Sequence, residues 1–334
     1  MDFEKVIRGG REIRNRVSDV VRAAFEKDRE FVLDVIKSDG GAIVLAPEQF
    51  RDDEEIMITA VNGCRYALAV ASDRLRGNRE FVLQAVRVKG LALEFASDDL
   101  RGDPEIVLEA LAYTPHWTHE FMEIIPEQLL LDQRIALALV KKNSLFLEEL
   151  PDEIKDNDEV VLAAVSNAGR VLEFVSERLR ADRKIVLAAV TNRGDAFRWA
   201  SQDLRGDLEI VLAAVGMYSS GQEHPLRYTT DELRDNDQVI KAAVGVDCNA
   251  LKFASDRLRD DRDVVLVATG HDKSFFAFQY ASARLRDDED VVSEAMKHSH
   301  YCYMYASRRV KGNLALLERF LKEEEEYRRK RRLF

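Results

Sequence analysis

The residues most suited to chemistry lie in the stretch HSHYC, where His298, His300 and Cys302 occupy alternate positions. Imidazole nitrogens and thiolates are preferred zinc ligands, and a Cys beside a His can also act as a nucleophile. Alternate spacing brings such side chains together on a strand, but this stretch lies at a turn that enters a helix. The three residues are therefore weak metal candidates. We expect no cofactor and predict that zinc does not copurify in stoichiometric amount.

Composition and charge narrow the class of protein. The 334 residues are 46% hydrophobic and 33% charged, which is sufficient for a folded core in water. No apolar stretch reaches the roughly 18 residues that a membrane span needs, and the first residues lack the apolar core of a secretory signal. Three widely spaced cysteines favour a reducing compartment. We expect a cytoplasmic or otherwise intracellular protein that has no membrane association.

One motif recurs along the chain with a nearly constant period. It opens with Asp or Asn and continues as in DREFVLDVI from Asp28, NREFVLQAV from Asn78 and DRKIVLAAV from Asp182. The twelve openings are Asp28, Asp53, Asn78, Asp103, Asp132, Asn157, Asp182, Asp207, Asn236, Asp261, Asp288 and Asn313, and most are 25 residues apart. Periods of about 20 to 50 residues are typical of solenoids and other repeat architectures.

The repeat predicts two helices. The opening Asp or Asn suits a helix N-cap, and the next residues are apolar on nearly every side, as in Ile185 to Val190, so we expect an inner helix. A turn, a shorter apolar segment and a last turn of the form SxxLR follow. Because such a short unit cannot bury its own apolar faces, copies must stack. We predict an all-α solenoid of about eleven repeats over residues 28–312, between an N-terminal cap (1–27) and a charged C-terminal helix and tail (313–334).

The repeated pattern D-x-E-[IF]-V-L-x-A-V followed by S-x-x-L-R resembles a known tandem helical repeat, domain-of-unknown-function family forty-one-sixteen. The resemblance covers about Asp28 to Asn313 and implies an all-helical array without an assigned activity. Repeat five departs from the pattern, since Glu149 stands where other copies have Phe or Tyr.

Three lengthened copies place extra residues in the turn after the first helix, around residues 113–120, 218–225 and 271–275. All six histidines lie in or beside the turn that follows the first helix of a repeat, whether or not that turn is lengthened. Loops carry many binding residues, so this edge is one candidate contact surface. Its candidate residues are His116, Trp117, His119, His224 and His271.

A second candidate surface is the position nine residues before each cap. Between Glu94 and Lys252 it holds four acids and then three bases: Glu94, Glu123, Glu148, Glu173, Arg198, Arg227 and Lys252. We name this set the charged row and expect it to face solvent, because the neighbouring positions are apolar or aromatic. The aromatic residues one position later, such as Phe174 and Trp199, are expected to pack in the core.

These patterns favour a noncatalytic scaffold or adaptor that binds a protein partner. A nucleic-acid-binding array is the alternative, which the net charge of −11 makes unlikely. A metal-dependent enzyme built on the HSHYC stretch is the second alternative. The basic cluster at Arg328, Arg329 and Lys330 could also direct nuclear import.

Overall fold

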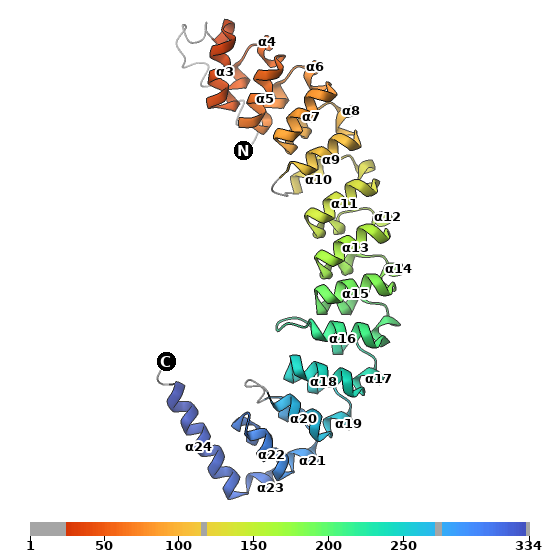
Figure 1. Cartoon of the computed structure of the whole chain (residues 1–334), viewed down its shortest axis with the longest axis vertical. Coiled ribbons are helices and arrows are strands. Elements are labelled where there is room, and N and C mark those ends of the chain that lie inside the picture. Colours follow the sequence, from red (N-terminus) through yellow and green to blue (C-terminus); the bar gives the residue numbers. More distant parts are fainter. Residues whose placement is uncertain (1–24, 115–118, 271–275, 332–334) are drawn as a thin grey trace. The chain divides into compact units, whose positions relative to one another are not determined.

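The structure is a computed structural model of the whole chain that describes residues 25–114, 119–270 and 276–331 (Figure 1). Within these ranges all regular structure is helical and there is no strand. The chain divides into two compact units, Met1–Ile154 and Lys155–Phe334. No helix in the described ranges is long and apolar enough to cross a membrane. The predicted all-α solenoid is confirmed, while the N-terminal cap lies almost entirely outside the described residues.

The repeat contains three helical pieces where the sequence predicted two. In one copy, α18 (Asp237–Val246) begins after Asn236, whose side chain accepts from the backbone N–H groups of Gln238 and Val239. The second predicted helix is a 3-10 segment, η10 (Cys248–Phe253), followed by the single α-turn α19 (Asp256–Arg259). Ser255 caps this turn by accepting from Leu258 N–H. With 6 residues, the segment is long for a 3-10 helix, since runs of more than about four residues are uncommon.

The first unit repeats this order of elements, except that an α-helix and then a 3-10 segment follow α9. They are α3 (Arg29–Ser38), η1 (Gly40–Leu45), α4 (Glu48–Arg51), α5 (Glu54–Gly63), η2 (Arg65–Val70), α6 (Asp73–Arg76), α7 (Arg79–Val88), η3 (Gly90–Phe95), α8 (Asp98–Arg101), α9 (Pro104–Ala112), α10 (His119–Ile124), η4 (Glu127–Leu131), α11 (Gln133–Lys142), η5 (Ser144–Glu148) and α12 (Asp152–Lys155), which ends at the boundary.

The second unit continues in the same way and ends in a longer helix. Besides α18, η10 and α19 it contains α13 (Asp158–Asn167), η6 (Gly169–Phe174), α14 (Glu177–Arg180), α15 (Arg183–Asn192), η7 (Gly194–Trp199), η8 (Leu204–Gly206), α16 (Leu208–Gly216), η9 (Pro225–Arg227), α17 (Asp231–Arg234), α20 (Arg262–Thr269), η11 (Ala277–Tyr280), α21 (Ala283–Arg286), α22 (Glu289–Met296), η12 (His300–Tyr305), α23 (Arg308–Lys311) and α24 (Leu314–Arg331). Phe320 of α24 stacks on Tyr303 of η12, with ring centroids 4.9 Å apart.

The long helix of each repeat is buried on its flanks but not all round. In the second unit α15 contacts the long helices α13 and α16 and the 3-10 segments η6 and η7. Its residues Ile185, Val186, Ala189 and Val190 are buried, whereas Leu187 and Ala188 are only half-buried. The expected inner helix is thus covered by neighbouring repeats on more than one face, and the stripe that holds Leu187 and Ala188 stays partly open to solvent.

Glycine opens several 3-10 segments because the next helix passes very close. A Cβ atom added at Gly194 would overlap the carbonyl oxygen of Ala214 in α16, and one at Gly169 would overlap that of Ala189 in α15. Only glycine allows this approach of backbone to backbone. Gly169 and Gly194 are thus packing residues between repeats.

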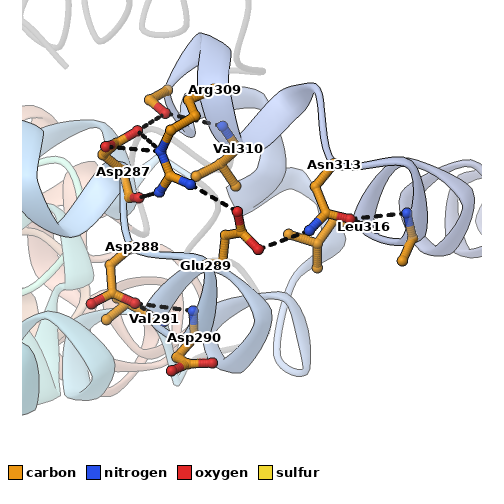
Figure 2. A network of polar contacts seen from close by, with 11 residues as sticks. Asp287, Asp288, Glu289, Asp290, Val291, Arg309, Val310, Asn313 and Leu316 are labelled. Atoms are coloured by element: carbon orange, nitrogen blue, oxygen red, sulfur yellow. Dashed lines mark hydrogen bonds and ion pairs between the residues drawn. The ribbon is translucent and has the colours of Figure 1, made fainter.

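At five junctions in the described part of the chain, an Asp of one repeat accepts hydrogen bonds from a Ser and an Arg of the next. We name this set of three residues the clasp. At the last of these junctions, Asp287 accepts from the Ser307 hydroxyl and from Arg309 Nε, which lies 3.1 and 3.2 Å from the two carboxylate oxygens (Figure 2). Arg309 also donates to the Asp287 carbonyl oxygen and, at 2.9 Å, to Glu289. Equivalent clasps join Asp52, Ser72 and Arg74; Asp156, Ser176 and Arg178; Asp235, Ser255 and Arg257; and Asp260, Ser282 and Arg284.

The two halves of the clasp vary together along the chain. Where the residue before a cap is Asp, the residue four before the next cap is Arg. At five other junctions neither residue is present. The residue before the cap is then Gly77, Gly102, Leu131, Ala181 or Gly206. The residue four before the next cap is, in the same order, Asp99, Gln128, Glu153, Asp203 or Glu232. This covariation between repeats is a signal that spacing alone did not bring out. Hydrogen bonds from Ser, then from Arg, lower the pKa of the clasp aspartates.

Arg or Lys stands two residues before ten of the twelve caps, and this row has a different role from the clasp. Arg205 donates to the carbonyl oxygens of Ala200, at 3.1 Å, and Arg198, at 2.7 Å, both in its own repeat. Arg205 therefore caps carbonyl groups near the end of the 3-10 segment. The cap Asp207 pairs instead with Arg183, the residue that follows the cap of the previous repeat, at 3.0 Å.

Candidate interaction surface

The charged row lies on the 3-10 segments and on α10. In the first unit Glu94 belongs to η3, Glu123 to α10 and Glu148 to η5, and all three are exposed. In the second unit the row comprises Glu173 of η6, Arg198 of η7, Arg227 of η9 and Lys252 of η10. Of these four, only Arg198 is half-buried. Each unit thus presents part of the row to solvent, acids in the first and mostly bases in the second.

The three bases of the second unit lie against aromatic rings or acids. The Arg198 guanidinium lies 4.7 Å from the centroid of the Trp199 ring, and Lys252 Nζ lies 4.8 Å from that of Phe253. Such cation–π contacts hold the charged group in place while one side of it still faces water. The aromatic position that we expected in the core is half-buried at Trp199 and Phe253, so its rings support the bases from below.

Glu223, which the sequence analysis did not select, brings two of the bases together. It lies in the insertion before η9 and accepts from Arg198 Nη1 at 3.2 Å and Arg227 Nη1 at 3.3 Å. The Tyr228 hydroxyl donates to the same carboxylate. The Tyr228 hydrogen bond and the two Arg charges lower the pKa of Glu223, so it is an anion at neutral pH. Its proximity to the row follows from the insertion and could not be read from the repeat period.

His224 is the histidine of the candidate loop edge whose side chain is described, and it is buried, with 7% of its surface exposed. Its ring stacks on Phe253, with centroids 5.1 Å apart, and lies 4.5 Å from the ring of Tyr218. Its Nδ1 accepts from Leu226 N–H. Burial lowers the pKa of His224 to about 4, so the ring is neutral at pH 7. His224 therefore packs the insertion against η10 and does not offer a contact surface.

The other loop-edge candidates lie outside the described structure. His116, Trp117 and His271 fall in undescribed ranges, and for His119 only its place at the start of α10 is described.

The HSHYC residues lie in three different environments. His298 is exposed, His300 is half-buried with its ring centroid 4.1 Å from that of Tyr301, and Cys302 is buried. Burial raises the pKa of the Cys302 thiol to about 12, so the thiolate that zinc binding or nucleophilic attack requires is strongly disfavoured. Among the described residues, no three His, Cys, Asp or Glu side chains are grouped as metal ligands.

Comparison with known proteins identifies the repeats. The model of a family described as a domain of unknown function (DUF4116) matches residues 28–76, 78–130, 132–180, 182–234, 207–259, 236–276 and 261–311. No curated protein matches the chain. No solved structure matches it either.

Proposed function

The chain belongs to the DUF4116 family, and we propose that it is a noncatalytic repeat scaffold or adaptor that binds a protein partner through the charged row. The observation that carries this proposal is the repeated presentation of one charged position to solvent, most fully in the second unit. There Arg198, Arg227 and Lys252 lie on consecutive repeats, and two of them rest on aromatic rings. Arg and aromatic side chains are enriched at protein interfaces.

Charges arranged in this way act mainly on association rate and on the choice of partner, and their effect fades with salt. We therefore expect an extended partner of complementary charge along the 3-10 segments of the second unit. We also propose a reducing intracellular compartment, since Cys64, Cys248 and Cys302 are free cysteines. Nuclear import through the basic C-terminal residues remains a proposal, because those side chains lie outside the described structure.

The test is charge reversal against a partner isolated with the wild-type protein. Replacing Arg198, Arg227 and Lys252 by Glu should leave the helical circular dichroism spectrum intact and weaken binding of the purified partner at least about tenfold at low salt. The matched control reverses Lys184, Lys241 and Arg262, which are exposed bases of the long helices in the same unit.

Two results would contradict the proposal. One is unchanged partner affinity in the triple reversal of the row, and the other is an equal loss in the control variant. Steeply salt-dependent binding of single-stranded RNA by the wild-type protein would favour the nucleic-acid array instead.

A further inference from the structure

Glu223 occupies a site that is built to hold a carboxylate. Three groups from two repeats converge on it: the guanidinium groups of Arg198 and Arg227 and the hydroxyl of Tyr228. The Glu223 side chain is 39% exposed and that of Arg227 is 63% exposed, so the site opens to solvent. A charged hydrogen bond at such an exposed position is weak enough to exchange with an external carboxylate.

The acid is peculiar to one repeat. Glu223 stands thirteen residues before the cap Asn236, and the same position in the neighbouring repeats holds Gly169, Gly194 or Cys248. The insertion therefore supplies an acid at a position where the common repeat pattern has none.

The next base along the row has no such acid. Lys252 is exposed, and in the described part of the chain its charge is held by the Phe253 ring and by no carboxylate. Phe253 in turn stacks on His224, the residue that follows Glu223. The insertion thus supports both the occupied site at Arg198 and Arg227 and the base beyond it.

We propose that Arg198, Arg227 and Lys252 form a binding strip for the acidic side chains of an extended peptide, with Glu223 as an intramolecular competitor for part of the strip. This deepens the proposed function, on which it rests, by naming the chemistry of the partner. The partner carboxylate displaces Glu223 from Arg198 and Arg227, and a second one binds Lys252.

The repeat sets the spacing of acids in such a peptide. Equivalent positions on packed helical repeats are about 10 Å apart. An extended chain advances about 3.3 Å per residue, so an acid three residues away from the one bound by Arg198 and Arg227 reaches Lys252 on the next repeat. A peptide of four Glu-Ser-Gly triplets has this spacing, and a peptide of the same composition with its four Glu contiguous does not.

The test measures binding of the fluorescein-labelled triplet peptide to the full chain by fluorescence anisotropy at low ionic strength. Glu223→Gln removes the competitor and should tighten binding about threefold, a gain that a misfolded protein could not produce. The double variant Arg227→Gln, Lys252→Gln should weaken binding at least about tenfold. Lys241→Gln, at an exposed base of α18 away from the row, is the matched control and should leave binding unchanged.

Each other result overturns the proposal. No peptide binding by either wild type or Glu223→Gln excludes the strip, and equal binding of the contiguous-Glu peptide excludes the repeat spacing. Tighter binding of oligouridylate, lost in the same double variant, would assign the strip to nucleic acid. Failure here is distinguishable from failure of the proposed function, because the charge-reversal test uses the isolated partner and this test uses only the synthetic peptide.

Discussion

Two leucines of the second unit allow the buried core and the half-open stripe to be compared by the same substitution. Leu172 of η6 is fully buried, whereas Leu187 of α15 is half-buried. Leucine to alanine in a closed core costs about 2 to 5 kcal/mol, because a cavity remains where the side chain was. We therefore expect Leu172→Ala to lower the free energy of unfolding by this amount.

The same substitution at Leu187 removes the same atoms with a smaller effect. Three apolar groups contribute about 0.8 kcal/mol each when fully buried, and roughly half of that when half-buried. Water fills the space at an open stripe, so no cavity cost is added. We expect Leu187→Ala to cost about 1 kcal/mol, less than the roughly 2 to 5 kcal/mol expected for the fully buried Leu172.

The assay is urea unfolding followed by tryptophan fluorescence. Trp199 lies in η7, which contacts both η6 and α15, and Trp117→Phe removes the other tryptophan of the chain from the signal. Because repeats share stability mainly with their neighbours, a probe in the affected repeats is preferable to a global one. Equal losses for the two alanine variants would refute the distinction between core and stripe, and a loss at Leu172 below about 0.5 kcal/mol would refute the core itself.

Three other predictions concern the clasps and His224. The folded-state pKa of Asp287 lies below its ordinary value, so this carboxylate stabilises the fold above about pH 4 and loses that effect as the pH falls through the lowered pKa. On the acid side, the slope of melting temperature against pH should therefore be smaller in Asp287→Asn than in the wild type. An unchanged slope would contradict the clasp. Asp235→Ala and Arg257→Ala should lower the melting temperature non-additively when they are combined. The control is Asp203→Ala, because Asp203 occupies the position of Arg257 at a junction without a clasp. Additive losses would show that Asp235 and Arg257 act separately. The folded-state pKa of His224 is about 4, so the unfolded chain takes up a proton first as the pH falls from 6.5 to 4. The free energy of unfolding should drop by about 3 kcal/mol over that window. A side-chain NMR titration midpoint near 6.5 would exclude the buried neutral ring.

Local patterns predicted the elements that depend on near neighbours in sequence. Asn236 caps α18 as its side-chain chemistry requires, and most of the apolar residues that follow it are buried, namely Val239, Ile240, Ala243 and Val244. The 3-10 form of η10 was not predicted, since an apolar run of six residues is compatible with either helix type. The exposure of Glu173, Arg227 and Lys252 agrees with their spacing before the caps.

The sequence by itself determined the repeat, the helix starts, the helical character of the described residues and the charge order of the row, because each depends on spacing within one unit of the repeat. Only the tertiary structure decided what those residues touch. It placed Glu223 between Arg198 and Arg227, buried His224 inside the insertion, and left Leu187 half-open. These outcomes depend on how one repeat packs on the next, and a period along the chain does not specify the contacts across that interface.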